Sequence, residues 1–404
     1  MRIVLTTDSY LPRLGGQEMG AFRLTKYLQR RGNPVRLITT ERHPLSGAEP
    51  GELDVLRAPH AFGPWSRRSL HRLLEMEFRK AEVVHSRYCY RLAAISAPVA
   101  RRLSRRFVVS LHGLGLLDNP QDSTFRRWSH RRYRRSSLAL ADAVIATSRE
   151  FAQLAAAYCD PRKIVVIPNG VDTDDFSASR AAPESLSRKY RSEQVVLAVR
   201  RLVPKNGIQY LVQAAPRILK SCPEVRFIIG GWGSQEAELK RLAEGLGVAP
   251  RFDFVGAIPN AEVPDYLSLA TLVVFPSSME STSHACLEAM AMGKPVVASR
   301  LGGLAELLGE EGRGVLVDLF DSRGSSYHAP PALSREASDR FADAIISLLR
   351  DSSRAQKLGA AGREYALAHF DWNVLVERIL SVYRGDSAAG DFSPSAEGSI
   401  PTRA

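Results

Sequence analysis

Two glutamates eight residues apart, Glu280 and Glu288, mark the stretch of this sequence that is richest in candidate chemistry. The stretch runs Phe-Pro-Ser-Ser-Met-Glu-Ser-Thr-Ser-His-Ala-Cys-Leu-Glu from Phe275. A helix that begins near Thr282 would leave Glu280 in the loop at its positive end and bring Glu288 nearly two turns into the helix. Thr282 and Ser283 would then offer donors to a diphosphate, and Glu288 would accept hydrogen bonds from sugar hydroxyls. Two exposed acids on a surface helix are the alternative, although a helix so rich in alanine favours a buried Glu288 that needs partners.

Three cations gather between a predicted strand and a predicted helix in the second half of the chain. Arg200 and Arg201 end the strand, and Lys205 follows in the Leu-Val-Pro-Lys-Asn-Gly connection to the helix. Cations at the carboxyl end of a strand, beside a helix N-terminus, would stabilise the negative charge that grows on a departing diphosphate. A solvated basic turn is the alternative.

Glycine-rich turns after two predicted strands are weaker signals for phosphate. Gly15 and Gly16 follow the first strand and open a helix, and Gly231 lies in a Gly-Gly-Trp-Gly turn after a later strand. Glycine leaves backbone N–H groups open to a ligand at such places, although a tight turn explains the pairs equally well. Neither turn carries the full dinucleotide fingerprint, which argues against a nicotinamide cofactor.

Short β-branched runs alternate with amphipathic stretches along both halves of the chain. Because each run is almost continuously apolar, it fits a parallel strand that helices cover on both faces. In the first half, strands are predicted at 3–7, 35–40, 83–86, 107–111, 144–147 and 164–167, and helices at 17–31, 68–80, 91–104, 123–140 and 149–158. After a Ser-, Ala- and Pro-rich stretch at 175–192, strands are predicted at 195–199, 227–229, 252–255, 272–275 and 296–298, and helices at 207–220, 234–246, 284–292, 338–350, 354–368 and 371–384.

This alternation predicts an α/β protein with two doubly wound parallel-sheet domains that face a cleft. We assign residues 1–190 to the first domain and 191–370 to the second, with the helix at 371–384 crossing back to the first. Residues 385–404 carry too little apolar surface to form a core and are expected to be a disordered tail.

The composition limits the class of protein. Its 404 residues are 45% apolar and 24% charged, which excludes a disordered or fibrous chain. No apolar run reaches the roughly 18 residues of a membrane span, and the N-terminus lacks the apolar core of a secretory signal, so the expected location is the cytoplasm. The four cysteines are too dispersed for a disulfide framework or a thiolate zinc site.

Positive charge is concentrated in the first half of the chain. Residues 1–190 hold 32 Lys/Arg and 18 Asp/Glu, whereas residues 191–404 hold 23 and 25. The densest cluster lies in the helix predicted at 123–140. Five of its arginines are candidates for contact with anionic lipid head groups at the inner face of the membrane or with an anionic acceptor: Arg126, Arg127, Arg131, Arg134 and Arg135. A solvated basic helix is the alternative, and no recognition motif points to nucleic acid as a partner.

Five motifs in this order resemble those of the group 1, or family 4, glycosyltransferases. They are Gly-Gly-x-Glu at 15–18, Ile-Pro-Asn-Gly-Val-Asp at 167–172, Arg-Leu-Val-Pro at 201–204, Glu-x7-Glu at 280–288, and Gly-Lys-Pro-Val-Val-Ala-Ser followed by Gly-Gly at 293–303. The resemblance covers residues 1–384. It implies the GT-B fold, in which two Rossmann-like domains bind the acceptor mostly in the first and the nucleotide sugar mostly in the second. It also implies transfer with retention of the anomeric configuration, without a metal or another cofactor.

The resemblance further implies roles for individual residues in nucleotide-sugar binding. Gly16 would meet the diphosphate through its backbone, Arg201 would bind the β-phosphate, and Glu288 would bind the ribose. Glu280 would lie against the donor sugar near its anomeric centre, and the backbone at Ile258 would hold the base.

Two further positions follow from the resemblance. His112, at the end of a predicted strand, is similar to a histidine that approaches a distal hydroxyl of the donor sugar. Asn206 is a departure, because the family usually has a lysine directly before Gly207. Since one position rotates a side chain by about 100° at a helix start, Lys205 still reaches the diphosphate, or Arg200 compensates, or donor binding is weaker.

The predicted function is transfer of a hexosyl group from a nucleotide sugar to an acceptor hydroxyl. The acceptor would be a saccharide or a lipid-linked molecule in polysaccharide, lipopolysaccharide or glycolipid biosynthesis. His112, Glu280, Arg201 and Lys205 would form the catalytic set of a same-face displacement, with a double displacement through Glu280 as the less favoured route. The Asp172-Thr-Asp174 string belongs to a connection and is not taken as a metal site.

Several other functions stay open from the sequence. One is a non-catalytic nucleotide-sugar-binding subunit of a partner glycosyltransferase, and another is a transferase that acts on a small soluble acceptor. A nucleotide-sugar hydrolase or a phosphorylase of the same fold is also conceivable, although no motif indicates the pyridoxal-binding lysine of a phosphorylase.

Overall fold

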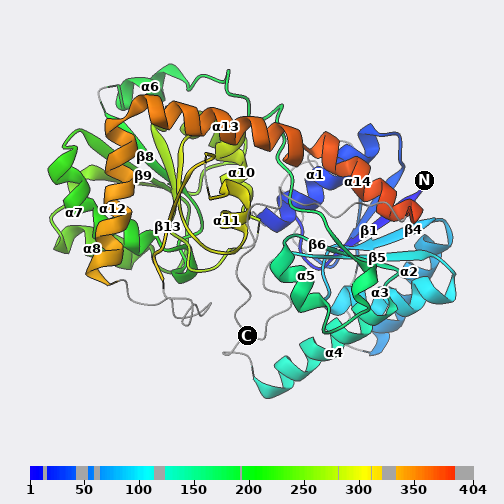
Figure 1. The fold of residues 1–404 in the computed structure, drawn as a ribbon. Helices are drawn as coiled ribbons and strands as arrows, with labels where there is room; N and C mark the ends of the chain where they lie inside the picture. The colour runs from blue at the N-terminus through cyan, green and yellow to red at the C-terminus, as the bar shows by residue number, and fades with distance from the viewer. Residues whose placement is uncertain are drawn as a thin grey trace. The chain divides into compact units, whose positions relative to one another are not determined.

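The computed structural model describes residues 1–11, 16–41, 53–58, 64–112, 123–191, 193–280, 282–310, 312–320 and 334–386. The chain forms two compact units, each with parallel strands covered by helices (Figure 1). The first unit contains Met1–Gly170 and resumes at Trp372, and the second contains Val171–Asp371.

The first unit has, within its described residues, a seven-stranded parallel sheet in the order β3-β2-β1-β4-β5-β6-β7. Its strands are β1 (Ile3–Thr7), β2 (Val35–Thr39), β3 (Asp54–Arg57), β4 (Val83–Ser86), β5 (Arg106–Leu111), β6 (Ala143–Ala146) and β7 (Ile164–Val166). Its helices are α1 (Gly16–Arg30), α2 (Pro64–Arg79), α3 (Arg91–Arg102), α4 (Thr124–Leu140), α5 (Arg149–Ala155) and α14 (Trp372–Arg384).

Both faces of this first sheet are buried, which explains why its strands are continuously apolar. Along β1, Ile3 and Leu5 join a core that includes residues of α1 and α14. Val4, whose side chain points to the opposite face, joins a core that includes residues of α2 and α3. The helices therefore cover the sheet on both sides, as the sequence pattern predicts.

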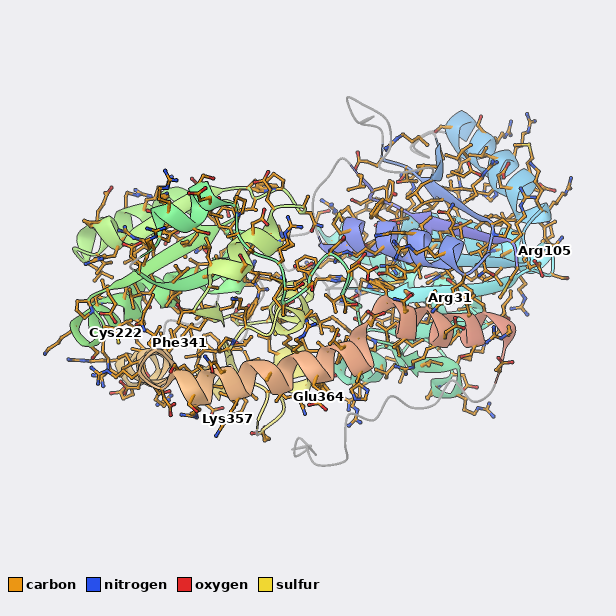
Figure 2. The ribbon with its side chains drawn as sticks, turned by 90° about the horizontal axis from the view of Figure 1, so that it is seen from above. Arg31, Arg105, Cys222, Phe341, Lys357 and Glu364 are labelled. Carbon is orange, nitrogen blue, oxygen red and sulfur yellow. The ribbon has the colours of Figure 1, made fainter. Side chains whose placement is uncertain are left out.

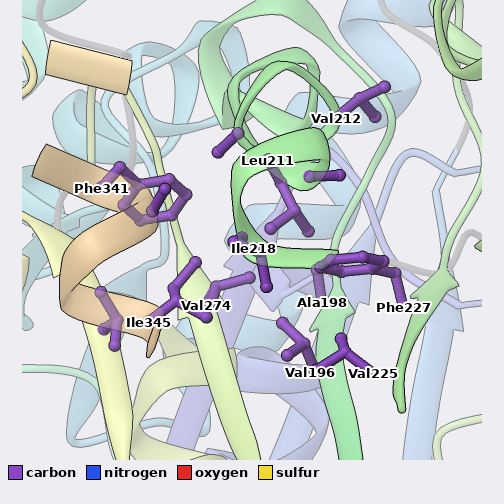
Figure 3. Close-up of a cluster of buried hydrophobic side chains, with 14 of the residues drawn as sticks. Val196, Ala198, Leu211, Val212, Ile218, Val225, Phe227, Val274, Phe341 and Ile345 are labelled. Atoms are coloured by element: carbon purple, nitrogen blue, oxygen red, sulfur yellow. The ribbon is translucent and has the colours of Figure 1, made fainter. Parts of the chain in front are cut away.

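The second unit has, in its described part, a six-stranded parallel sheet in the order β10-β9-β8-β11-β12-β13. Its strands are β8 (Gln194–Val199), β9 (Val225–Gly230), β10 (Phe252–Gly256), β11 (Leu272–Phe275), β12 (Val296–Ser299) and β13 (Val315–Val317). Its helices are α6 (Glu184–Lys189), α7 (Ile208–Ser221), α8 (Glu236–Gly245), α9 (Val263–Leu269), α10 (His284–Ala291), α11 (Gly302–Leu308), α12 (Arg335–Arg350) and α13 (Ser352–Phe370). Leu211 of α7 and Phe341 of α12 pack over Val196 of β8 in its core (Figure 3).

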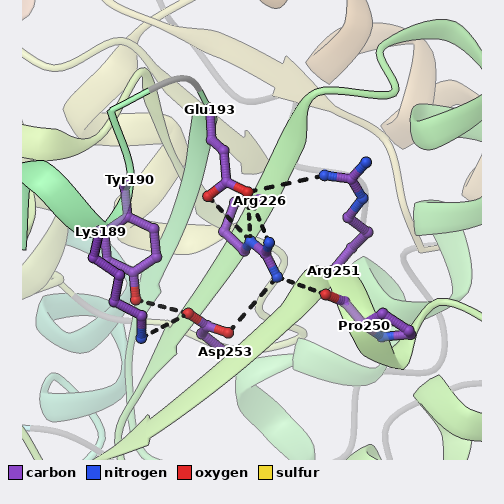
Figure 4. A network of polar contacts seen from close by, with 7 residues as sticks. All are labelled: Lys189, Tyr190, Glu193, Arg226, Pro250, Arg251 and Asp253. Carbon is purple, nitrogen blue, oxygen red and sulfur yellow. Dashed lines mark hydrogen bonds and ion pairs between the residues drawn. The ribbon is translucent and has the colours of Figure 1, made fainter.

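The chain passes between the two units at Gly170–Val171, earlier than the boundary predicted at residue 190. Residues 171–191 pack with the second unit because Phe176 is fully buried there. At the end of this segment the Tyr190 hydroxyl donates to Asp253 Oδ2 at 2.8 Å, in a network of charged groups along β9 and β10 (Figure 4). Polar residues of the segment that was predicted to be a linker instead take part in this surface network.

Helix α13 packs closely against the segment that follows α10. A Cβ on Gly359 would lie 2.2 Å from the carbonyl oxygen of Gly293, so only glycine permits this approach. Its exposed side includes Lys357 and Glu364, both labelled in Figure 2. This close contact fixes the C-terminal end of α10, the helix that carries Glu288.

The predicted class of two doubly wound α/β domains is confirmed. The elements that the sequence pattern missed, β3, β13, α6, α9 and α11, have three to seven residues each. Such short elements give too few repeats for a period to be recognised. Among the described helices, none has the length and apolarity needed to cross a membrane.

Candidate functional site

Three adjacent strands of the second sheet bring most of the predicted donor-binding residues to one edge. Strand β8 pairs in parallel with both β9 and β11, so all three carboxyl ends lie at the same edge. Arg200 follows β8, Gly231 follows β9, and Pro276 begins the loop after β11 that leads to Glu280. Ligands of open parallel sheets bind at this edge.

Two glycines allow the connections at this edge to pack backbone against backbone. Gly231 has φ +139°, and a Cβ there would lie 1.8 Å from the carbonyl oxygen of Arg200. Gly207 has φ +72°, and its Cβ would lie 1.8 Å from the carbonyl oxygen of Pro276. The N–H group of Gly231 donates to the carbonyl of Gly256 at 2.6 Å. Gly231 therefore serves packing, its N–H group is bonded to Gly256 in this structure, and its role in nucleotide-sugar binding stays a prediction.

Arg200 and Glu280 form an ion pair inside the second unit. Nη2 of Arg200 donates to Oε2 of Glu280, and the two side chains are only 7% and 12% exposed. The guanidinium also lies 5.3 Å from the ring centre of Phe275. Arg201, the predicted ligand of the β-phosphate, is exposed after β8, whereas its neighbour Arg200 is paired with Glu280.

Lys205 lies near this ion pair in a partly buried position. Burial lowers the pKa of its ammonium group, the Glu280 charge opposes that effect, and Arg200 and Arg201 add to it. The carbonyl of Lys205 accepts from the backbone N–H of Ser278 at 2.8 Å, which ties the turn after β8 to the loop after β11. Two predicted motifs thus meet through a direct hydrogen bond.

Helix α10 begins with a side-chain cap. Ser283 is the N-cap, and its Oγ accepts from the Cys286 N–H at 3.4 Å. Thr282 and Ser283 are buried, and Glu288 is 8% exposed within the helix. These positions agree with the predicted helix start within two residues. A buried carboxylate in so apolar a helix is costly unless it has partners, which fits a binding role better than a surface role.

Ile258 covers the end of β9. A Cβ added to Gly230 would lie 2.3 Å from Cδ1 of Ile258, so this glycine makes room for the isoleucine side chain. Ile258 itself is partly exposed, beyond β10. It is therefore available beside the strand ends, as expected for a residue near a bound base.

In the first unit, His112 contacts two of the sequence motifs. Its Nδ1 lies 3.2 Å from Oδ1 of Asn169, which belongs to the Ile-Pro-Asn-Gly-Val-Asp motif. Its carbonyl accepts from Nε2 of Gln17, next to Gly16 in the Gly-Gly-x-Glu motif, at 3.4 Å. The imidazole is 7% exposed, with the ring of Tyr88 edge-on at 6.0 Å. Gly16 is exposed as the first residue of α1, and the predicted Gly15 lies outside the described residues.

Asp8, which the sequence analysis did not select, lies at the carboxyl end of β1. Its Oδ1 accepts from the N–H of Leu92 at the start of α3 at 3.2 Å. Burial raises the pKa of Asp8 to about 6, although this backbone bond and the charge of Arg91 oppose the rise. A position directly after a strand was the signal that could have identified it.

The basic helix α4 combines exposed cations with exposed aromatic rings. Phe125 is 74% exposed, Trp128 is 55% exposed, and their rings stack at 5.9 Å. The guanidinium of Arg132 lies 5.9 Å from the Trp128 ring centre. Of the five predicted contact arginines, three are exposed: Arg126, Arg131 and Arg135. A fourth, Arg127, is partly exposed.

The predicted surface contact is wrong for Arg134. It is 1% exposed, and its guanidinium lies 5.8 Å from the ring centre of Tyr158. Position 134 falls on the same helix face as the buried Ser137 and Leu138, because residues three and four apart share a face. Arg134 therefore packs inside the first unit and is not available to a surface ligand.

Models of two glycosyltransferase families match the chain in succession. The model described as Glycosyltransferase Family 4 matches residues 14–175, and the model described as Glycosyl transferases group 1 matches residues 184–324. Together they cover both units. All five sequence motifs fall within these two matches.

Two relatives of this chain are named for inositol-containing acceptors. The GDP-mannose-dependent alpha-(1-6)-phosphatidylinositol monomannoside mannosyltransferase of Mycobacterium tuberculosis (strain CDC 1551 / Oshkosh) is 33% identical over 246 residues, which are 59% of this chain and 60% of that relative. The match thus spans less than two thirds of the relative's length. The D-inositol 3-phosphate glycosyltransferase of Acidothermus cellulolyticus is 33% identical over 325 residues, which are 75% of this chain and 67% of the relative.

A solved structure shares the fold of the whole described chain. The crystal structure of a glycosyltransferase from Rickettsia africae ESF-5 superposes with a TM-score of 0.76 at 20% identity. The match covers 95% of this chain and 98% of the other. At that identity the likeness concerns architecture, and it confirms the predicted GT-B fold.

Proposed function

Because the chain belongs to the group 1, family 4 glycosyltransferases, we propose that it transfers a hexosyl group from a nucleotide sugar to an acceptor hydroxyl. One observation carries the proposal. Arg200, Lys205 and Glu280 meet at the edge where β8 and β11 end, next to the N-terminus of α10. Lys205 and a helix N-terminus suit a diphosphate, and the neighbouring carboxylate that Arg200 holds suits sugar hydroxyls.

The proposed reaction retains the anomeric configuration. The bond between the anomeric carbon and the β-phosphate oxygen breaks, and the acceptor oxygen bonds to the same carbon on the same face. The departing phosphate oxygen takes the acceptor's proton. In this proposal Lys205, exposed Arg201 and the N-terminus of α10 stabilise the negative charge of the leaving nucleoside diphosphate, a task that these groups can perform without a metal. His112 is proposed to contact the donor sugar.

The central test is a panel of nucleotide sugars. UDP-, GDP-, ADP- and dTDP-sugars are offered with acceptors that include inositol phosphate and phosphatidylinositol, and both transfer and donor hydrolysis are followed. A ligand at 100 times its dissociation constant should add about 2.7 kcal/mol to the apparent stability, so thermal shifts report binding independently. We expect one base to give both stabilisation and transfer.

Glu288→Ala serves as the inactive comparison in this panel. It should lose transfer and stabilisation by the preferred donor, because the buried carboxylate is the proposed ribose ligand. Glu238→Ala, at an exposed position in α8, is the matched control and should behave as the wild type. If no nucleotide sugar stabilises the wild type and none is consumed, the proposed function is wrong.

Retention and metal independence have their own tests. The anomeric configuration of the product, determined by NMR, should equal that of the donor; an inverted product would exclude same-face displacement. Treatment with EDTA followed by gel filtration should leave the turnover unchanged. A loss of turnover that Mg²⁺ or Mn²⁺ restores would contradict the metal-independent route.

We also propose that α4 attaches the protein to an anionic membrane that carries its acceptor. Exposed Phe125 and Trp128, flanked by exposed arginines, combine the apolar and cationic groups that suit a lipid interface. The phosphatidylinositol-based acceptor in the name of the Mycobacterium tuberculosis relative is a membrane lipid, which supports this choice. The four cysteines are free thiols, which fits the reducing cytoplasmic side of the membrane.

Liposome binding tests this attachment. The wild type should sediment with vesicles containing phosphatidylserine at low salt and much less with pure phosphatidylcholine. Phe125→Ala/Trp128→Ala should weaken binding by at least about tenfold, since each ring loses burial in the interface. Equal binding by this double variant, or none by the wild type, would refute the attachment through α4.

A further inference from the structure

The ion pair of Arg200 and Glu280 is held by a third residue, Asn206. Asn206 is 4% exposed and uses both ends of its side-chain amide. Its Oδ1 accepts from Nη2 of Arg200 at 3.4 Å, the same nitrogen that donates to Glu280. Its Nδ2 donates to the carbonyl of Arg201 at 2.7 Å. Asn206 thus connects the guanidinium of Arg200 to the carbonyl of the next residue, Arg201.

The charges around this amide explain why a neutral side chain suits the position. The charge of Lys205 interacts with those of Arg200, Arg201 and Glu280, and Glu280 is itself paired with Arg200. A further cation at position 206 would be nearly buried among three others and would compete with Arg200 for Glu280. An amide instead accepts a hydrogen bond from a cation and donates one to a carbonyl, so both of its polar ends are satisfied.

Because the ion pair of Arg200 and Glu280 is largely buried, its stability depends strongly on the positions of the two groups. The interior strengthens the attraction between guanidinium and carboxylate, but both groups lose hydration and need fixed partners. Nη1 of Arg200 is buried and has no hydrogen-bond partner within the described residues. The ring of Phe275 and the amide of Asn206 therefore contribute to fixing the guanidinium.

We propose that Arg200 and Asn206 are positioning residues for Glu280. Arg200 holds the carboxylate in an ion pair and directs it toward the donor sugar, and Asn206 keeps Arg200 in place. A carboxylate neutralised by a guanidinium accepts hydrogen bonds from sugar hydroxyls and is a poor nucleophile, which favours the same-face displacement. This inference rests on the proposed function, because the donor sugar is the group that Glu280 would contact.

The first experiment measures kcat and KM for donor consumption in variants that keep the ion pair. Asn206→Ala should lower kcat by about tenfold, the equivalent of one buried hydrogen bond, while the KM for the donor changes less. Gln209→Ala is the matched control, since its amide donates to the carbonyl of Pro204 in the same turn. An unchanged kcat in Asn206→Ala, or an equal loss in Gln209→Ala, would overturn the inference.

The second experiment compares kcat and KM in variants of Arg200. Arg200→Met removes the ion pair with Glu280 and should lower kcat by about tenfold or more, while the KM for the donor changes less. Arg200→Lys keeps a cation and should restore most of the wild-type kcat. An unchanged kcat in Arg200→Met, or no recovery in Arg200→Lys, would contradict the role of Arg200.

A binding measurement separates this inference from its alternatives. Nucleoside diphosphate without sugar should bind Arg200→Lys and Asn206→Ala as it binds the wild type. If these variants weaken its binding in parallel with turnover, Arg200 is a phosphate ligand and the positioning role is wrong. If the wild type consumes no nucleotide sugar at all, the proposed function fails first, and that outcome is recognisable before any variant is compared.

Discussion

The carbonyl oxygen of Arg200 occupies the space into which a side chain at Gly231 would project, only 1.8 Å from the position of its Cβ. This contact joins the end of β8 to the turn after β9. It holds the backbone of Arg200 while the side chain of the same residue binds Glu280. The position of the ion pair therefore depends on a glycine in a neighbouring strand connection.

Gly231→Ala should consequently destabilise the protein and disturb the donor site. The substitution combines an unfavourable φ of +139° with a clash against backbone, and we expect a loss of about 3 kcal/mol or more in the free energy of unfolding. Gly245→Ala is the control, because a Cβ there meets nothing within 4 Å at the end of α8. Urea unfolding of both variants should show a large loss for the first and little change, or a small gain, for the second.

Lys205→Met should raise the stability of the protein while it weakens the binding of nucleoside diphosphate. Burial lowers the pKa of Lys205, so its charged form is disfavoured in the folded state, and the variant should melt at a higher temperature than the wild type at neutral pH. The difference should shrink as pH rises through the lowered pKa toward the ordinary value near 10.4. Nucleoside diphosphate should bind the variant at least about tenfold more weakly, measured by calorimetry. Unchanged binding would show that Lys205 does not reach the diphosphate.

Asp8→Asn should change the pH dependence of stability. Since burial raises the pKa of Asp8 to about 6, the folded state retains a proton that the unfolded chain releases near pH 4. Wild-type stability should therefore fall as pH rises from about 4 to about 6 and then stay level. Asp8→Asn lacks this loss and should be more stable at pH 7 by up to about 2 kcal/mol. Parallel melting curves of the two proteins across pH 4–7 would contradict the raised pKa.

The sequence predicts the fold well because its strongest signals are local. Continuous apolar runs mark strands buried on both faces, and β1, β4 and β11 begin and end where their patterns do. The half-exposed edge strand β3 is missed because its Asp-Val-Leu-Arg carries neither a continuous nor an alternating pattern. The boundary near residue 190 is misplaced because the burial of Phe176 in the second unit is a tertiary effect.

The candidate site is less predictable than the fold, since its decisive contacts join distant residues. Arg200 and Glu280 are 80 positions apart, and only the pairing of β8 with β11 makes them neighbours. In the sequence, Asn206 looks like the loss of an expected lysine. In the structure, its amide connects the side chain of Arg200 to the carbonyl of Arg201. Residue types and motif spacing identify the region of the candidate site. Which side chains pair within that region depends on the order of the strands in the sheet.

Arg134 and Arg135 of α4 give a final matched comparison, because adjacent positions place one guanidinium in the core and the other in solvent. Arg134→Ala removes a buried side chain near Tyr158 and should cost about 2–4 kcal/mol of unfolding free energy. Arg135→Ala should leave stability within about 0.5 kcal/mol of the wild type and weaken binding to anionic vesicles about fivefold, the effect of one charge near a lipid surface. Thermal melting and vesicle sedimentation at low salt measure the two effects separately. If Arg135→Ala binds vesicles as the wild type does, this part of α4 does not face the membrane; if Arg134→Ala melts normally, its burial contributes nothing to the fold.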